Sequence, residues 1–181
     1  MTSIKHFILT VCLVALPASA LAQRVPHTDS AAIGGDVGIF IPRQDGMKWG
    51  PALEGFYEYY FTPRTSLRLG LGWANAPFDR EDDDSIRTLR VPIDVVYNVE
   101  GGQVHPFLGA GLGIYFLQPR DNGESSGDSE TKLGATIFGG AEFFTGRTLS
   151  MKGEARYHIV GETFGLEQGG LTVTIGVKTY F

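Results

Sequence analysis

Hydrophobic and polar residues alternate along most of the chain after residue 30. A period of two places successive side chains on opposite faces of a β-strand. In the clearest run, Leu67, Leu69, Leu71 and Trp73 alternate with small or polar residues. Eight such runs follow one another, over residues 31–41, 52–61, 66–74, 88–97, 105–116, 132–143, 149–159 and 170–181. The same region shows no helical period of 3.6 residues, so the sequence predicts an all-β protein.

The lengths of the runs and of their connections indicate the kind of β protein. Runs of about ten residues match tilted strands that cross a membrane, whereas globular strands average about five or six. The connections alternate between short turns (62–65, 98–103 and 145–148) and long polar loops (42–50, 75–85, 118–130 and 161–170). This alternation is typical of an outer-membrane barrel. The predicted fold is therefore an eight-stranded antiparallel up-and-down transmembrane β-barrel over residues 31–181.

Alternation alone does not say which face of the strands points outward. A soluble lipocalin-type barrel also has eight strands, with an apolar interior. In this chain the polar face is rich in glycine, as in Gly109, Gly111 and Gly113, which suits the narrow interior of an eight-stranded barrel. Aromatic residues of the apolar face gather near strand ends, where membrane barrels carry interfacial girdles. Both features favour an apolar outer wall, with one expected girdle of Tyr59, Phe61, Tyr97, Phe143 and Phe181 and another of Trp73, Phe116 and Tyr157.

The first 22 residues differ from the rest. Lys5 and His6 precede an apolar run that ends in small residues, which predicts a secretory signal peptide cleaved after Ala22. A lipoprotein signal at Cys12 is the alternative, but Val11 stands where a small residue is expected. Residues 23–30 form a polar, loose lead-in.

Processing also changes the composition. Loss of Lys5 leaves 14 basic against 20 acidic residues, a net charge of −6, which disfavours nucleic-acid binding. Cys12 is the only cysteine, so the exported chain is not built on disulfides.

The inward face carries charges of both signs in near balance. Isolated buried charges cost several kcal/mol unless they are paired, so we expect a closed network of ion pairs rather than an ion-selective pore. Pro92 lacks a backbone donor, which predicts a bulge or break in strand pairing nearby. The expected lumen network comprises Asp36, Glu54, Glu58, Arg68, Arg90, Asp94, Lys132, Glu142, Lys152, Glu154, Arg156, His158 and Lys178.

Three segments carry a family resemblance: "RVPIDVVYNV" (90–99), "HPFLGAGLGIYF" (105–116) and the terminal "TVTIGVKTYF". Together they resemble the small OmpA-, OmpX- and OmpW-like barrels of Gram-negative bacteria, grouped as the outer-membrane protein β-barrel domain. The resemblance implies location in the outer membrane among lipid and lipopolysaccharide, and commonly no enzymatic activity. It assigns no cofactor, metal or catalytic residue. It also implies that the assembly machinery reads the terminal Tyr180 and Phe181, while the long loops meet an unknown surface partner.

Three alternative roles remain open. OmpW-like barrels let small hydrophobic molecules through the wall, and Pro92 and the glycines of residues 105–116 are the local hints. A lipid A-modifying enzyme would need a nucleophile, base and acid, for which only Ser150, His158 and Glu154 are candidates. The acidic loop 79–84 could bind a divalent cation, but its spacing does not match a calcium loop.

Deletion of Phe181 should lower the amount of barrel in outer-membrane fractions more than it lowers the stability of barrel that has folded in detergent. The resemblance implies this, since the terminal aromatic is read during assembly. Membrane levels can be followed by immunoblot and folding by a heat-modifiability gel. Normal membrane levels of the truncated chain would contradict the expectation.

Overall fold

The protein is an eight-stranded antiparallel β-barrel. The computed structural model describes residues 26–79, 84–99, 101–121, 124–125, 128–163, 166–167 and 169–181. The expected signal peptide and its cleavage site, and most of the acidic loop 79–84, lie outside the described residues. The barrel strands are β1 (Ala31–Pro42), β2 (Gly50–Tyr60), β3 (Thr65–Pro77), β4 (Ser85–Asn98), β5 (Val104–Asp121), β7 (Glu130–Phe144), β8 (Leu149–Val160) and β11 (Gly170–Tyr180).

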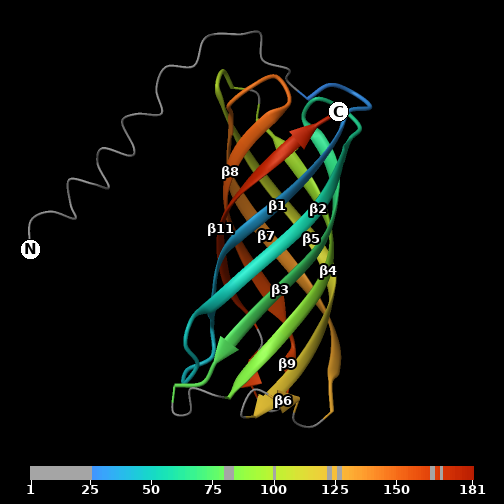
Figure 1. Ribbon diagram of the computed structural model, residues 1–181. Coiled ribbons are helices and arrows are strands. Elements are labelled where there is room, and N and C mark those ends of the chain that lie inside the picture. The colour runs from blue at the N-terminus through green and yellow to red at the C-terminus, as the bar shows by residue number, and fades with distance from the viewer. Residues whose placement is uncertain are drawn as a thin grey trace, which may run out of the picture.

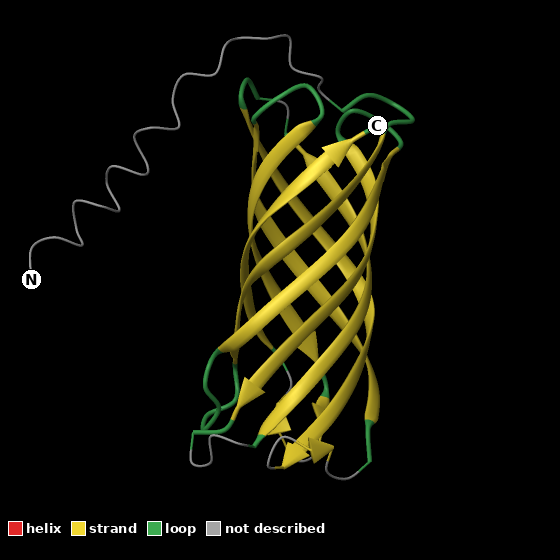
Figure 2. Ribbon diagram, in the orientation of Figure 1, coloured by secondary structure: helices red, strands yellow, loops and turns green. Residues whose placement is uncertain are grey.

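Each strand pairs with its sequence neighbour, and the last strand returns to the first. Pairing runs β4-β3-β2-β1-β11-β8-β7-β5, and β4 pairs with β5 to complete the ring (Figures 1 and 2). The β1–β11 seam extends from Ala32 opposite Tyr180 to Pro42 opposite Gly170. Ala31 and Phe181 exchange backbone hydrogen bonds of 3.1 and 2.9 Å. Closure leaves no free strand edge, and it confirms the predicted fold class.

The connections segregate by length. Short turns lie at the end of the barrel that holds the C-terminus, and the long connections lie at the other end, with β6 (Glu124–Ser125) and β9 (Glu162–Thr163) (Figure 1). β9 pairs with β10 (Leu166–Glu167). Several strands run past their predicted ends; β5 continues to Asp121 rather than stopping at residue 116. We call the two ends the turn end and the loop end. No helix in the described residues has the length and apolar character needed to span a membrane.

The two faces of the sheet divide as the alternation predicts. Apolar side chains such as Leu112 (69% exposed) and Ile175 (67% exposed) project from the outer wall, whereas nearly all the acidic and basic side chains of the strands' middle portions are buried inside. The outer wall is therefore apolar, and the interior is polar. This arrangement is the reverse of a soluble lipocalin-type barrel.

Pairing between β3 and β4 is interrupted near Pro92. Leu69 pairs with Ile93 and the ladder resumes at Gly72 and Arg90, with the two intervening residues of each strand unpaired. The flanking pairs keep the same offset, so no residue is inserted and the feature is a break rather than a bulge. The predicted disturbance is confirmed, and its cause is the missing backbone N–H of proline.

The described part of the lead-in, residues 26–30, is held in place rather than loose. Ser30 and Asp29 exchange backbone hydrogen bonds of 2.9 Å with Tyr60, and the Ser30 hydroxyl donates to the His27 carbonyl at 2.7 Å. Tyr59 Oη donates to Asp29 Oδ1 at 2.8 Å. The lead-in thereby continues the pairing of β1 with β2 at the turn end of the barrel.

Glycines on the two faces should respond differently to substitution. A Cβ at Gly140, which faces inward, would lie 2.0 Å from the Gly153 carbonyl oxygen, whereas one at the outward Gly55 would meet nothing within 4 Å. Gly140→Ala should therefore lower the free energy of unfolding by about 1–3 kcal/mol, and Gly55→Ala should not lower it. Urea unfolding in lipid vesicles measures both, and equal effects would contradict this account of the inner face.

Candidate functional site

Charged side chains from seven strands fill the middle of the lumen; only β5 contributes none. Each is at most 5% exposed. The carboxylates are Asp36, Glu54, Glu58, Asp94, Glu142 and Glu154, and the cations are Arg68, Arg90, Lys152, Arg156 and Lys178.

Glu154 on β8 connects three of the cations. Its carboxylate lies 2.7 Å from Arg68 Nη1, 2.9 Å from Lys152 Nζ and 2.9 Å from Arg156 Nε. Lys152 also contacts Asp36 Oδ2 at 2.7 Å, which ties β8 to β1. Glu154 is thus the branch point through which the two halves of the network are joined.

Toward the loop end, Arg156 and Arg90 share one carboxylate. Arg156 donates to Asp94 Oδ2 at 2.8 Å and lies 3.6 Å from Glu54 Oε1. Arg90 contacts the other oxygen of Glu54 at 2.9 Å. These contacts link β2, β4 and β8 directly across the lumen.

Toward the turn end, the network continues into a layer of aromatic side chains. Arg68 and Lys178 each lie 3.1 Å from Glu58 Oε2, and Lys178 lies 3.0 Å from Glu142. Lys178 Nζ also donates to Tyr60 Oη at 2.6 Å, and Tyr180 Oη donates to Glu142. Tyr60 and Tyr180 pack with Ala32 and Phe144 in a buried cluster, so the polar network ends beneath an aromatic layer.

Inward aromatic rings pack against the cations, a feature that the sequence analysis did not single out. The Arg156 guanidinium lies 4.1 Å from the centroid of Phe138, and Lys152 Nζ lies 4.5 Å from that of Phe56. Arg68 stands 4.7 Å from the Phe56 ring. Cation–π contacts of this kind are worth more when the charge is removed from water. The sequence did offer one sign of these contacts, because Phe56 and Phe138 occupy the same alternate positions of their strands as the inward-facing charges.

Inner-face glycines make room for the carboxylates. A Cβ at Gly111 on β5 would lie 2.0 Å from Asp94 Oδ1, and one at Gly176 would lie 1.9 Å from Asp36 Oδ1. At these two positions the volume of the network requires glycine, whereas Gly34 and Gly109 make room for the rings of Phe56 and Phe138.

Two members of the predicted network occupy other environments. Lys132 is about one-third exposed at the loop end, where its Nζ pairs with Glu130 at 3.2 Å. His158 is buried but bonds to neutral groups, with Tyr115 Oη 3.0 Å from Nδ1 and Thr172 Oγ1 2.8 Å from Nε2. Lys132 therefore lies outside the ion-pair network in which the sequence analysis placed it, because parity identifies the face of a strand but not the depth of a residue. A lone histidine in a charged lumen is expected to act as a hydrogen-bond partner, and His158 does so.

Without Lys132, the buried set has six carboxylates and five cations instead of the expected six of each. Within the described chain, Asp36 Oδ1, Glu54 Oε1 and Arg156 Nη2 of this set have no hydrogen-bond partner, and the last two lie 3.6 Å apart. No group of three His, Cys, Asp or Glu side chains in the described residues is arranged to hold a metal ion.

The three candidate residues of a lipid A-modifying site do not converge. Ser150 donates a hydrogen bond to Glu142, whereas His158 bonds to Tyr115 and Thr172. Eight residues of one strand place Ser150 and His158 about 26 Å apart. The structure therefore gives these residues no common site.

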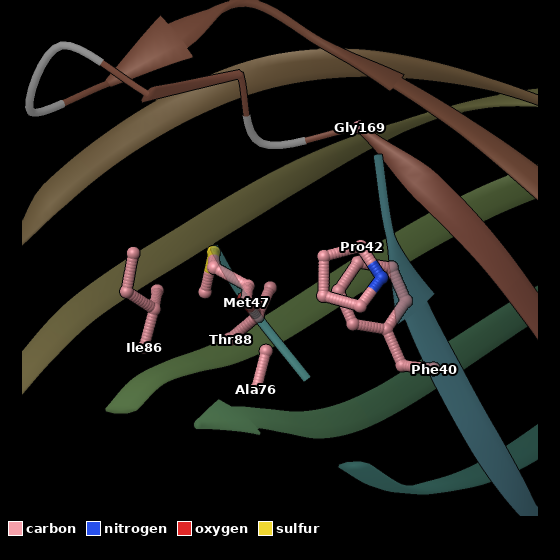
Figure 3. A pocket seen from close by; sticks show the side chains of 7 residues that line it. All are labelled: Phe40, Pro42, Met47, Ala76, Ile86, Thr88 and Gly169. Carbon is pink, nitrogen blue, oxygen red and sulfur yellow. The ribbon is translucent and has the colours of Figure 1, made fainter. Parts of the chain in front are cut away.

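Apolar side chains replace charges at the loop end of the lumen. A small pocket of about 10 Å³ lies there, with room for roughly one water-sized molecule (Figure 3). Figure 3 shows Met47, Thr88 and Ile86 on one side and Phe40 with Pro42 on the other. We call this region the apolar mouth; it is lined by Phe40, Pro42, Met47, Ala76, Ile86, Thr88 and Gly169.

An apolar outer wall around a buried polar interior, with every strand paired, defines an integral outer-membrane β-barrel. The model of the outer membrane protein beta-barrel domain family matches residues 8–178. The chain belongs to this family, which confirms the predicted resemblance and places the protein in the outer membrane. A search among curated protein sequences returned no match.

Solved structures of small outer-membrane proteins share the fold at low sequence identity. Neisserial surface protein A has a TM-score of 0.70 at 15% identity, covering 83% of this chain and 97% of that protein. OprG from Pseudomonas aeruginosa has a TM-score of 0.68 at 11% identity, covering 88% and 99%. The attachment invasion locus protein Ail of Yersinia pestis has a TM-score of 0.60 at 15% identity, covering 85% and 99%.

Glu154→Gln should destabilise the barrel strongly, because it removes the charge shared by three buried cations. Breaking a buried ion pair costs about 3–5 kcal/mol. Glu130→Gln is the matched control: its pair with Lys132 is partly exposed, and such pairs contribute about 0–1 kcal/mol. Urea unfolding in lipid vesicles compares the two variants, and a Glu154→Gln loss no larger than that of Glu130→Gln would contradict the role of Glu154 as branch point.

Proposed function

We propose that the protein is a non-enzymatic outer-membrane barrel whose lumen is sealed and whose long loops interact with partners at the cell surface. The observation that carries the proposal is the continuous ion-pair network from Arg90 to Lys178, with the aromatic layer at the turn end. Opposite charges hold one another across the lumen through contacts of 2.7–3.1 Å around Glu154 and Glu58. An ion-selective pore would instead need an open path with rings of one sign of charge.

The loops are the surface available to partners outside the cell. A structure of the Ail protein is a complex with the heparin analogue sucrose octasulfate, so a barrel of this fold can bind a sulfated ligand. The loop 78–85 of this chain carries five acidic residues, which do not suit a sulfated ligand whose charges would lie against the loop itself. We therefore propose surface recognition as the role and do not transfer that ligand to this protein.

The route to the membrane completes the proposal. We infer cleavage after Ala22, with residues 23–30 as the lead-in of the mature chain, and recognition of Tyr180 and Phe181 by the assembly machinery. Phe181 supports this, since its side chain is 66% exposed on the outer wall. Tyr180 points into the lumen instead, so its contribution to assembly would come from the unfolded chain.

A second candidate function is the passage of small hydrophobic molecules, as the OmpW-like resemblance suggests. The apolar mouth would admit such a molecule, and the break between β3 and β4 beside Pro92 lies below it in the wall. Because the charged network blocks the lumen below the mouth, the molecule would leave through the wall at this break and enter the lipid. The mouth holds only about 10 Å³, so this function requires it to widen.

Ion conductance and probe uptake separate the two functions. The mature chain in planar bilayers should show no conductance steps above the lipid baseline, because the charged network occupies the lumen. In vesicles it should not accelerate entry of an uncharged hydrophobic fluorophore. Stable single-channel steps would contradict the sealed lumen.

Accelerated uptake would favour the second function if it depends on the apolar mouth. Ala76→Phe would fill the mouth, where Ala76 is 3% exposed, and should abolish such uptake. Ala141→Phe adds the same ring to the outer wall and serves as the matched control. Uptake that both variants retain would reflect leakage around the barrel rather than passage through it.

A further inference from the structure

The outer wall is not uniformly filled. A shallow hollow of about 390 Å³ crosses β1, β2, β3 and β4, the strands on the near side in Figure 1. Its floor is formed by Gly35 and Gly55, which stand directly opposite each other on β1 and β2. Its sides are apolar and include Leu53, Leu71, Trp73 and Leu89.

Neither floor glycine is required by the fold. Among the described residues the only glycine with positive φ is Gly46, so Gly35 and Gly55 have backbone conformations open to any residue. A Cβ at Gly55 would meet nothing within 4 Å, and one at Gly35 would make only an ordinary contact at 3.6 Å. Glycine within a strand weakens it and often marks close approach of a ligand. The hollow exists because Gly35 and Gly55 have no side chains, although neither backbone conformation nor packing requires glycine at these positions.

An arginine stands at the loop end of the hollow. The Arg87 guanidinium lies 6.0 Å from the ring centroid of Trp73, which lines the hollow. Arg87 is half-buried on the outward face of β4, and its Nε is buried without a hydrogen-bond partner in the described chain. The paired residues on either side, Asn75 of β3 and Gln118 of β5, carry amides. This group offers a cation and amide donors directly above an apolar surface.

We propose that this hollow binds one lipid A moiety of lipopolysaccharide, with an acyl chain over Gly35 and Gly55 and a phosphate at Arg87. Long loops mark the extracellular side of outer-membrane barrels, so Arg87, two residues from the loop end of β4, lies at the outer-leaflet boundary. Lipid A is the phosphorylated, multiply acylated anchor of that leaflet. Guanidinium groups match phosphate oxygens in geometry and charge, and Trp73 suits the interface. The proposal rests on the outer-membrane location and not on whether the lumen is sealed.

Binding of purified lipid A to the mature chain in detergent tests the proposal by native mass spectrometry. Arg87→Gln should weaken binding of bis-phosphorylated lipid A about tenfold, equivalent to about 1.4 kcal/mol, with little effect on dephosphorylated lipid A. Gly55→Leu should weaken both forms, because its side chain would occupy the hollow. Leu53→Trp narrows the same hollow and replaces Gly55→Leu if that variant does not fold.

Two matched controls report on the specificity of these effects. Arg147→Gln removes an exposed arginine at the turn end, and Gly153→Leu adds the same side chain to the outer wall of β8, where a Cβ has no contact closer than 4.0 Å. Both should bind lipid A as the native chain does. A heat-modifiability gel on each variant shows separately that the barrel has formed.

Three outcomes would overturn the proposal. One is equal lipid A affinity in Arg87→Gln, Gly55→Leu and the native chain. Another is a tenfold weaker binding of phosphatidylglycerol in Arg87→Gln, equal to the loss for lipid A, which would make the hollow a general phospholipid site. The third is a native dimer that Gly55→Leu dissociates, which would assign the hollow to contact between two copies of the chain.

Discussion

A charge inside a narrow barrel must meet an opposite charge or be neutralised, and this requirement organises the interior of the protein. Glu154 contacts Arg68, Lys152 and Arg156, and each of these cations also pairs with a second carboxylate, so the charges form one connected network. Gly111 of β5 and Gly176 of β11 follow from the same requirement, because Asp94 and Asp36 occupy the volume that larger side chains would take. The apolar outer wall is the complement of this arrangement: polar groups are gathered inside, which leaves the outside free to face lipid.

The interior is layered along the barrel axis. Aromatic side chains lie at the turn end, ion pairs occupy the middle, and the Tyr115–His158–Thr172 group separates the charges from the apolar mouth. Hydroxyl and imidazole groups can each donate and accept hydrogen bonds, so they can bond to one another at the boundary between the charged and the apolar regions. The gradient means that the two ends of the lumen present different surfaces, one rich in tyrosine hydroxyls and one nearly apolar.

The period-two pattern was sufficient for the number of strands, their order and the sign of each face, because those depend only on local alternation and connection lengths. The pattern could not predict the depth of each residue along the barrel axis or the register between neighbouring strands. Lys132 and Lys178 share the inward parity of their strands. Lys132 is nevertheless about one-third exposed at the loop end and Lys178 is 1% exposed, since strand tilt and stagger set the height of each residue. The pairing of Gly35 with Gly55, and the position of Arg87 over Trp73, likewise exist only once the strands are in register. The alternation could have placed Phe56 and Phe138 on the inward face, but their contacts with Arg68 and Arg156 depend on how the strands are arranged around the barrel.

The seams between strands differ in the continuity of their pairing, and this has a structural consequence. The β1–β11 seam is continuous from Ala32 to Pro42, although it joins the two ends of the chain. The β3–β4 seam lacks pairing at two consecutive positions beside Pro92, in the middle of the wall. The local loss of pairing therefore falls between two strands that are neighbours in sequence, whereas the strands at the two ends of the chain are joined by an unbroken ladder. A local parting of the wall beside Pro92 would leave the first and last strands hydrogen-bonded to each other.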